Sequence, residues 1–294
     1  MATFYDTIYR PPTEARSLLL EVSAGCSYGK CTFCRLSNGE VPLQLASRGM
    51  LIDSLMELAT RGEAGKRLYL TGENVLAFRT RYLLDLFELV KSFLPGIREF
   101  AMYGRADDIA GKSDQQLSWL HEAGLDTVYV GVESGNARVL EACNKGETPE
   151  EIIRQLHRLD RAGIRYGLSS ILGLGGEELW REHARDTAAL YLQVSPRSIR
   201  VMTLTPLEGT PLAADVAAGR FRLPPPRMIL EEERALLEAL DGVSPCRFVG
   251  NHGSNALPLV GNLPGDRQRL IGILTAALEG GPVPEAAPGG PARW

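Results

Sequence analysis

Three cysteines fall within nine residues of the chain, at Cys26, Cys31 and Cys34, in the spacing C-x4-C-x2-C. The other two cysteines, Cys143 and Cys246, lie far from this group and from each other. An odd number of cysteines clustered in this way argues against a disulfide framework and favours metal binding or catalysis. Any fold that the chain adopts must therefore present one short loop that carries three sulfur ligands.

Thiolate sulfur is a soft ligand that suits iron–sulfur clusters and zinc. Four cysteines fill every iron of a [4Fe–4S] cubane, whereas three leave one iron with an open position that chemistry can use. Zinc ribbons usually bring a second short pair of cysteines or histidines, and the sequence contains no such pair. The spacing favours an iron–sulfur cluster, and a zinc site completed by a remote cysteine or histidine is the alternative.

The cysteine loop directly follows the first of six segments that have the pattern of buried strands. Segments with helical spacing separate these strands, and such alternation implies a parallel sheet with helices packed outside it. A barrel of eight units usually needs about 250 residues, so six units fit this stretch better. We predict an α/β fold, a partial (β/α)6 TIM-type barrel with a C-terminal helical and irregular extension. The predicted strands span residues 18–23, 68–71, 100–103, 127–132, 168–172 and 199–204.

Composition divides the chain into four parts, a lead-in over residues 1–16, the barrel over 17–210, the extension over 211–279 and a tail over 280–294. The tail is rich in Gly, Pro and Ala, which predicts disorder. The formal net charge of −4 gives no general attraction to an anionic membrane and argues against a large RNA substrate. Since neither a signal peptide nor a run of 18 apolar residues is visible, we expect a cytoplasmic protein.

The segment over residues 25–34 resembles the cluster-binding loop of the radical S-adenosylmethionine (SAM) superfamily. Most of that superfamily has the spacing C-x3-C-x2-C, so this loop is one residue longer, and Gly29 is expected to let the loop absorb the extra residue. A subset of uncharacterised members is similar, with the same spacing and a lead-in like the one that begins at Arg10. The resemblance runs from about Tyr9 to Leu278. It implies a [4Fe–4S] cluster on the three cysteines, with SAM at the open iron.

Two strand ends extend this resemblance. Thr71-Gly72-Glu73-Asn74 follows the second strand and resembles the Gly-Gly-Glu segment that receives the amino group of SAM. A glycine permits close backbone approach, and a carboxylate suits an ammonium group. Glu133-Ser134 ends the fourth strand and is similar to a segment of the coproporphyrinogen oxidase branch and its tRNA-modifying relatives, in which a Glu or Gln contacts SAM. The resemblance implies that both segments bind SAM.

Four further residues occupy positions that contact SAM in this branch. Lys145 falls where the branch carries a basic residue that faces the SAM carboxylate, and a solvated charge at a helix end is the alternative. Phe33, between two of the cysteines, and Leu204, on the sixth strand, match positions beside the adenine. Ser169 lies on the fifth strand, shortly before a glycine-rich turn. The alternative for Phe33 is packing beneath the loop.

Three polar residues are candidates for contact with the substrate. Tyr103 and Arg105 end the third strand, at the mouth of the predicted barrel, although arginines at strand ends are often surface charges. His252 stands in a polar run of the extension and could carry a proton, with a locally satisfied polar loop as the alternative. The remaining histidines lie on predicted helices, where we expect them to be solvated. They are His121, His157 and His183.

The resemblance implies an enzyme that cleaves SAM reductively to methionine and a 5′-deoxyadenosyl radical, which abstracts hydrogen from a substrate. An outside electron donor such as flavodoxin or ferredoxin is implied as well. We expect a small-molecule substrate, which the sequence does not identify. Three alternatives stay open: a haem-binding or haem-delivery protein on the same scaffold, a tRNA-modifying radical SAM enzyme, and an interaction module organised by zinc.

Overall fold

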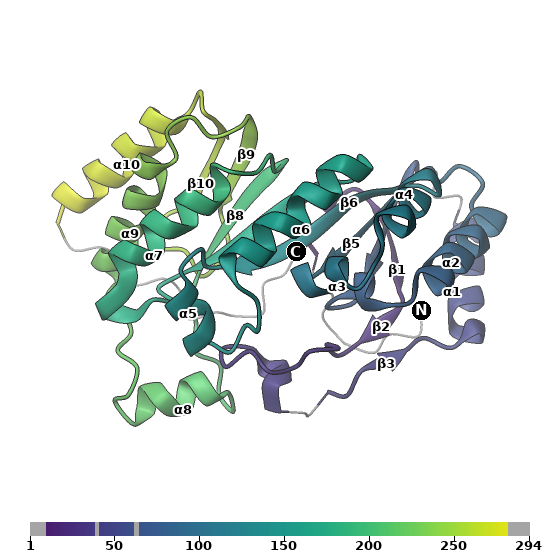
Figure 1. Ribbon diagram of the computed structural model, residues 1–294, viewed down its shortest axis with the longest axis horizontal. Coiled ribbons are helices and arrows are strands. Elements are labelled where there is room, and N and C mark those ends of the chain that lie inside the picture. Colours follow the sequence, from purple (N-terminus) through teal and green to yellow (C-terminus); the bar gives the residue numbers. More distant parts are fainter. Residues whose placement is uncertain (1–9, 39–40, 62–64, 282–294) are drawn as a thin grey trace.

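The computed structural model describes residues 10–38, 41–61 and 65–281, and its centre is a sheet of eight strands. Six of these strands are neighbours in chain order and run parallel, with helices in each connection (Figure 1). This arrangement confirms the predicted partial (β/α)6 TIM-type barrel. The six strands are β1 (Leu18–Glu21), β4 (Arg67–Thr71), β5 (Glu99–Gly104), β6 (Leu125–Glu133), β7 (Arg165–Leu172) and β8 (Ser198–Thr203).

Two more strands extend the same sheet beyond the predicted six. Strand β9 (Cys246–Gly250) pairs in parallel with β8, and β10 (Leu259–Leu263) pairs antiparallel with β9. The sequence pattern did not identify them because each is only five residues long and each contains a glycine. The predicted extension therefore adds strands as well as helices to the barrel. Its boundary at residue 210 stays a prediction, and the tail beyond residue 281 lies outside the described residues.

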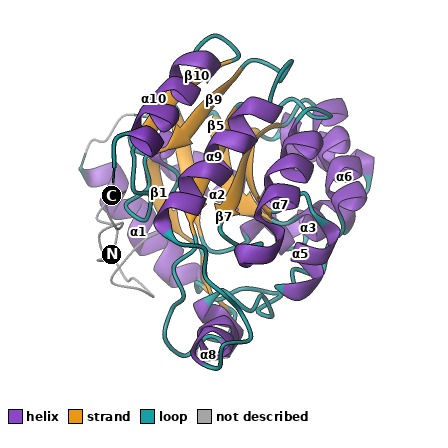
Figure 2. Cartoon of the chain, turned by 90° about the vertical axis from the view of Figure 1, so that its left-hand side faces the viewer, coloured by secondary structure: helices purple, strands orange, loops and turns teal. Residues whose placement is uncertain are grey.

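Helices cover the outer face of the sheet (Figure 2). Helix α6 shows why these segments fold as predicted: Thr148 and Glu151 form a capping box, Pro149 occupies the first turn, and Gly163 ends the helix in the left-handed conformation. Apolar side chains of the helices and of the outward-facing strand positions form one continuous core. The helices are α1 (Arg48–Thr60), α2 (Thr80–Phe93), α3 (Ala106–Ala110), α4 (Asp114–Glu122), α5 (Ala137–Ala142), α6 (Pro149–Ala162), α7 (Gly176–Tyr191), α8 (Pro211–Ala217), α9 (Pro226–Ala239) and α10 (Arg267–Glu279).

The lead-in closes the amino-terminal end of the barrel. Glu14 is 1% exposed, and its carboxylate accepts hydrogen bonds from the Arg67 guanidinium at 2.6 Å and from the Tyr129 hydroxyl at 2.6 Å. Thr13 also contacts the Tyr129 hydroxyl, at 2.8 Å. The predicted lead-in, over its described residues 10–16, is therefore an integral part of the barrel floor.

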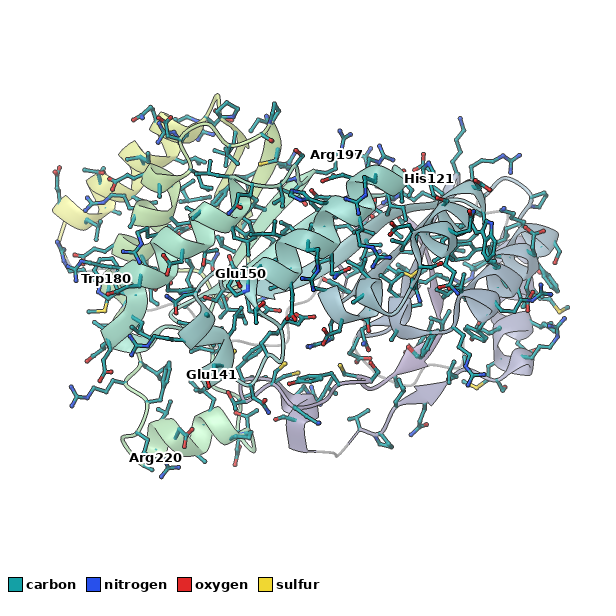
Figure 3. The ribbon with its side chains drawn as sticks, viewed as in Figure 1. His121, Glu141, Glu150, Trp180, Arg197 and Arg220 are labelled. Carbon is teal, nitrogen blue, oxygen red and sulfur yellow. The ribbon has the colours of Figure 1, made fainter. Side chains whose placement is uncertain are left out.

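The two ends of the barrel lie on opposite sides of the molecule. Arg197, just before β8, lies at the upper edge in Figure 3, whereas Glu141, on the helix that follows β6, lies below. The carboxyl ends of the parallel strands thus face the lower side, where catalytic groups gather in barrels of this kind. Among the helices in the described part of the chain, none is long and apolar enough to cross a membrane.

Candidate active site

The cysteine loop lies at the carboxyl end of β1 and is fixed by its own backbone. The short strands β2 (Ser23–Ala24) and β3 (Gln44–Leu45) pair antiparallel and close the base of the loop. Gly25 has a φ of +75°, and a Cβ atom there would lie 2.6 Å from the Pro42 carbonyl oxygen, so only glycine fits. Three half-buried thiols lie in this loop, those of Cys26, Cys31 and Cys34.

Two neighbouring segments hold the loop in place. The Asn74 side chain accepts a hydrogen bond from the Ser27 amide at 3.1 Å and donates to the Ser27 hydroxyl at 2.6 Å. The Thr32 amide donates to the Cys143 carbonyl at 2.9 Å, at the end of α5. Asn74, expected among the SAM contacts, therefore uses its side chain to anchor the cysteine loop.

The three thiols and their surroundings fit an iron–sulfur cluster. Burial raises the pKa of the Cys31 and Cys34 thiols, that of Cys34 to about 11. Deprotonation of these thiols therefore requires positive charge, which ligated iron supplies. Among the described residues, no three His, Cys, Asp or Glu side chains come close enough to bind one metal ion. The three thiolates of a [4Fe–4S] cluster bind three different irons, so their sulfur atoms can lie farther apart than the ligands of one metal ion.

The turn after β4 offers unsatisfied polar groups to a ligand. The hydroxyl groups of Ser23 and Thr71 are buried, and neither has a hydrogen-bond partner among the described residues. A Cβ atom on Gly72 would lie 2.2 Å from the Ser23 hydroxyl oxygen, so this turn tolerates no side chain. Glu73 follows, half-buried. Such uncompensated buried groups are costly, and a polar ligand would satisfy them.

A buried charge network, defined by Arg105, Glu133, Lys145 and Glu147, lies beside Cys31. Lys145 Nζ is 3.5 Å from Glu133 Oε1 and 3.6 Å from Glu147 Oε2. Arg105 Nη2 is 3.5 Å from Glu147 Oε1, and it donates a hydrogen bond to the Lys145 carbonyl at 2.7 Å. Arg105 Nη1 reaches the Cys31 sulfur at 3.8 Å. Arg105, Glu133 and Lys145, all predicted site residues, therefore lie beside Cys31, a predicted cluster ligand.

The position of Lys145 excludes one of its two interpretations. This side chain is buried, with the residue only 3% exposed, so it is not the solvated charge of the alternative. Burial opposes its charged form, but Glu133 and Glu147 together raise the Lys145 pKa above its ordinary value. A permanent cation therefore stands between two carboxylates, which suits a ligand that carries charges of both signs.

The backbone at Glu133 is unusual. Its φ is +65°, in the left-handed region that non-glycine residues seldom adopt, at a register shift between β6 and β7. A Cβ atom on Gly131 would lie 2.2 Å from Glu133 Oε1, so the glycine makes room for this carboxylate. Such a conformation costs about 1–3 kcal/mol and persists where surrounding contacts enforce it, often at functional sites.

The remaining predicted SAM contacts separate into three groups. Phe33 and Leu204 pack against the same small apolar cluster, with Ile171, although 171 positions separate them in the chain. Ser134 is fully buried and accepts a hydrogen bond from the Asn136 amide, so it shapes the turn after β6. Ser169 instead faces the barrel interior.

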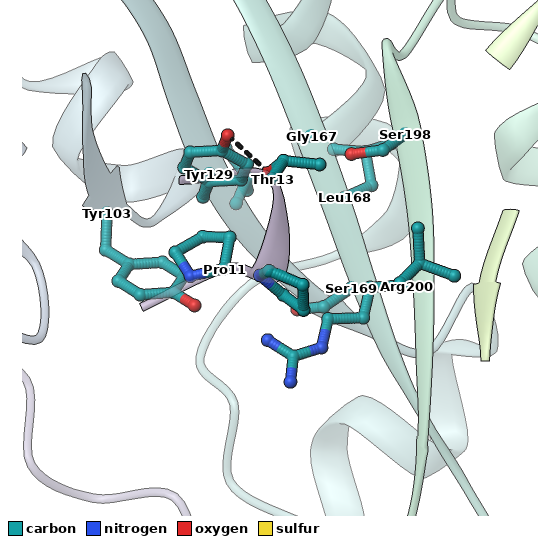
Figure 4. Close-up of a pocket in the computed structure, with 12 residues that line it drawn as sticks. Pro11, Thr13, Tyr103, Tyr129, Gly167, Leu168, Ser169, Ser198 and Arg200 are labelled. Atoms are coloured by element: carbon teal, nitrogen blue, oxygen red, sulfur yellow. Dashed lines mark hydrogen bonds between the residues drawn. The ribbon is translucent and has the colours of Figure 1, made fainter. Parts of the chain in front are cut away.

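A small cavity lies inside the barrel, next to the lead-in (Figure 4). It is lined by Tyr103, Ser169 and Arg200 from three strands and by Pro11 and Thr13 of the lead-in. Burial lowers the pKa of Arg200 and raises that of Tyr103, and each side chain partly opposes the shift of the other. Arg200 thus places a cation at a cavity that is otherwise mainly apolar.

His252 lies near this cavity, on the loop after β9. Its ring accepts a hydrogen bond from the Ser254 amide at 3.2 Å and lies 2.7 Å from the Ser254 hydroxyl. Burial, together with the positive charge of Arg200, lowers the pKa of His252 to about 4. The ring is therefore neutral at physiological pH and is a weaker base than an exposed histidine.

Several residues of the site were not recognised from the sequence. Glu147 completes the charge network, Arg200 lines the cavity, and the Tyr28 ring stacks beneath Arg105 at 3.9 Å from the guanidinium carbon. The only feature of the sequence that could have indicated Glu147 is its position two residues after Lys145. The expectation that His183 is solvated is wrong: it is 2% exposed and bonded to Glu232. His121 and His157 are exposed, as expected.

Comparison with known protein families gives a match over the barrel. The model of the radical SAM superfamily matches residues 20–188. The biotin synthase of Rhodopseudomonas palustris (strain BisB18) is 27% identical over 213 residues, which cover 72% of this chain and 58% of that protein. The chain spans less than two thirds of the length of the first curated relatives it matches, 58% and 60%.

Solved structures show the same architecture. The radical S-adenosylmethionine methyltransferase TsrM from Kitasatospora setae, solved with cobalamin and a [4Fe–4S] cluster bound, is 17% identical, with a TM-score of 0.55 over 69% of this chain and 37% of that one. Coproporphyrinogen III oxidase from Escherichia coli is 18% identical, with a TM-score of 0.55 over 76% of this chain and 52% of that one. At these identities the likeness establishes the partial barrel fold.

Proposed function

The chain belongs to the radical SAM superfamily, whose members use a [4Fe–4S] cluster and SAM, and we propose that Cys26, Cys31 and Cys34 hold the cluster in this protein. We propose further that it cleaves SAM reductively and abstracts a hydrogen atom from a small-molecule substrate. The observation that carries this proposal is the contact of the buried charge network with Cys31.

The charge network has the chemistry to hold the methionine part of SAM. Lys145 offers a cation to the carboxylate of SAM, and Glu133 and Glu147 offer acceptors to the N–H groups of its amino nitrogen and to the ribose hydroxyls. Ser23 and Thr71 offer further hydroxyl groups from the neighbouring strand ends. Phe33 and Leu204 provide the apolar surface that an adenine ring would cover. Five of these seven residues also follow from the family resemblance.

When bound, the cluster and SAM supply the one-electron cleavage of a carbon–sulfur bond. The residues of the chain bind and orient these groups and keep water away from them. The electron must come from an outside donor, for which a flavodoxin or a ferredoxin is suitable. Since oxygen destroys exposed clusters, the protein requires a reducing compartment.

We take side chains that line the small cavity in the barrel as candidate contacts of a small-molecule substrate. Tyr103, Ser169 and Arg200 bring polar groups to this mainly apolar space (Figure 4). A guanidinium in such a space binds carboxylate or phosphate groups well. His252, neutral and close to Arg200, is a further candidate contact.

The test is anaerobic reconstitution with iron and sulfide, followed by dithionite and SAM. We expect the protein to form 5′-deoxyadenosine, and we expect deuterium from a labelled metabolite to enter it. Haem binding with a Soret band and no cleavage of SAM would instead identify a haem carrier. Deuterium transfer from labelled tRNA would contradict the small-molecule substrate, and colourless protein that holds zinc would contradict the cluster.

A further inference from the structure

The turn that carries Glu133 is held from outside the barrel by one face of helix α7. His183, Asp186 and Thr187 share this face because they are three and four residues apart. Each of them contacts a different residue of the turn over residues 133–136. His183 Nε2 lies 3.3 Å from the Glu133 carbonyl oxygen, and Thr187 Oγ1 accepts from the Gly135 amide at 2.9 Å. Asp186 Oδ2 accepts from the Asn136 side-chain amide at 2.6 Å.

His183 is in turn bound by a residue of the extension. Its Nδ1 lies 2.7 Å from Glu232 Oε1, on helix α9. The same carboxylate accepts a hydrogen bond from the Gly173 amide, at 3.0 Å to Oε2. Gly173 begins the glycine-rich turn after β7. The His183–Glu232 pair therefore connects the ends of β6 and β7, which both border the proposed SAM site.

This pair is fully enclosed and far from solvent. His183 is 2% exposed and Glu232 is 0% exposed. Burial of an imidazole and a carboxylate is costly unless every polar atom is bonded, and here both ring nitrogens and both carboxylate oxygens have partners. Apolar residues would fill the same space without that cost, so hydrogen bonding to the two turns is what the pair adds.

The Glu133 backbone shows why such support is needed. Its left-handed conformation is strained for a residue with a side chain, and a carbonyl held by His183 opposes relaxation to an ordinary strand conformation. Rotation of this backbone would move the Glu133 carboxylate away from Lys145. From these contacts we infer that His183 and Glu232 are positioning residues that fix Glu133 in its SAM-binding geometry. The inference rests on the proposed function, since it takes Glu133 as a SAM contact.

The adjacent residue Glu233 provides a matched control. It is 1% exposed and lies on the same helix, but it faces Gly250 of β9, not the turns. Its Oε1 has no hydrogen-bond partner among the described residues. Glu232→Leu and Glu233→Leu therefore remove equally buried carboxyl groups from neighbouring positions. His183→Phe removes both ring hydrogen bonds and keeps a planar ring in the space.

Glu232→Gln is the conservative variant. A glutamine there can donate to His183 Nδ1 and accept from the Gly173 amide, which leaves a proton on Nε2 for the Glu133 carbonyl. All contacts of the pair then persist without a charge. A purely electrostatic role for Glu232 would be lost in this variant, whereas a positioning role would be retained.

Two measurements test the inference on reconstituted full-length protein with equal cluster content. The first is SAM affinity, read from the change that SAM causes in the EPR spectrum of the reduced cluster. We expect His183→Phe and Glu232→Leu to weaken SAM binding about tenfold, as loss of a buried hydrogen bond would. We expect Glu232→Gln and Glu233→Leu to bind within about twofold of wild type. Equal SAM affinity in Glu232→Leu and Glu233→Leu would overturn the inference.

The second measurement is amide hydrogen exchange in the peptide over residues 131–136, without SAM. We expect exchange to accelerate in His183→Phe and Glu232→Leu and to stay unchanged in Glu233→Leu. This measurement distinguishes a failure of the positioning role from a failure of the proposed function. A wild-type protein that holds the cluster but does not bind SAM refutes the proposed function. Unchanged exchange in His183→Phe refutes the positioning role, whatever the outcome for SAM.

Discussion

The guanidinium of Arg105 lies 3.8 Å from the sulfur of Cys31, with Nη1 directed at Sγ. The same guanidinium stacks on the Tyr28 ring and donates to the Lys145 carbonyl, so its position is fixed from three sides. Hydrogen bonds and positive charge near cluster sulfur stabilise the reduced state of an iron–sulfur cluster. We therefore expect Arg105 to stabilise the reduced state of a cluster held by Cys31.

Replacement of Arg105 by glutamine should make the cluster harder to reduce. Loss of about 1 kcal/mol of charge-assisted hydrogen bonding corresponds to a midpoint potential about 40 mV more negative for one electron. Spectroelectrochemical titration of the cluster measures this shift. Arg35→Gln, at an exposed residue next to Cys34, removes the same charge and serves as the control. An equal shift in both variants would contradict a specific contact.

Alanine variants of the loop cysteines should not hold a stable cluster. Cys31→Ala and Cys34→Ala each remove one of three ligands, so we expect less than about a tenth of the wild-type iron after reconstitution. Iron and sulfide analysis, with the absorbance near 400 nm, provides the measurement. Cys143→Ala and Cys246→Ala change buried cysteines outside the loop and should retain the iron. Similar iron content in all four variants would refute the ligand assignment.

Lys145→Met should weaken SAM binding strongly and leave the protein folded. The substitution leaves Glu133 and Glu147 facing each other without their cation and removes the proposed partner of the SAM carboxylate. We expect SAM affinity to fall by about two orders of magnitude, as for a buried charge pair that loses one partner. Equilibrium SAM binding to the reconstituted variant checks this value.

A second buried lysine supplies the comparison for that experiment. Lys112, also buried, donates to the Phe78 carbonyl at 2.9 Å, away from the cysteine loop. Lys112→Met should lower the free energy of unfolding and leave SAM affinity unchanged. If both lysine variants lost SAM affinity to the same degree, global destabilisation would explain the loss.

The barrel floor should make stability depend on pH. Burial raises the pKa of Glu14, but hydrogen bonds from Arg67, Ser17 and Tyr129 outweigh burial and hold it below its ordinary value. A lowered folded-state pKa means that this stabilisation is present above the unfolded pKa and is lost as pH falls through the folded pKa. The free energy of unfolding in urea should therefore fall between pH 7 and pH 3. In Glu14→Gln this fall should be smaller.

At neutral pH, Glu14→Gln should cost about 3 kcal/mol, because it leaves the Arg67 guanidinium without its most buried partner. Glu99→Gln is the control: Glu99 also binds Arg67, at 3.0 Å, but 44% of its side chain is exposed. We expect that variant to cost less than about 1 kcal/mol. Equal free energies of unfolding in the two variants would show that the lead-in does not hold the floor.

The predictable parts of this protein depend on local patterns. Six strands, their helices and the capping box at Thr148 follow from hydrophobic periodicity and from residues three or four positions apart. The cysteine spacing is equally local. These patterns placed the loop, the β4 turn and Glu133 at one end of a barrel, where the structure has them.

The unpredicted parts depend on contacts between distant segments. Glu147 contacts Arg105 although 42 positions separate them in the chain, and no local sequence pattern marks that contact. His183 lies on an amphipathic helix, and the sequence alone does not reveal that Glu232, on a helix of the extension, faces it. Strand β9 forms by pairing with β8, and β10 by pairing with β9, rather than by strong intrinsic preference.

The most direct test of the account is pulsed EPR of the reduced protein with SAM labelled in its amino nitrogen and carboxylate oxygen. Three sulfur ligands with an open iron predict hyperfine coupling of both labels to the cluster, because the amino and carboxylate groups bind that iron. A protein that holds iron and sulfide but shows no coupling from either label would contradict the open coordination position on which the proposed function depends.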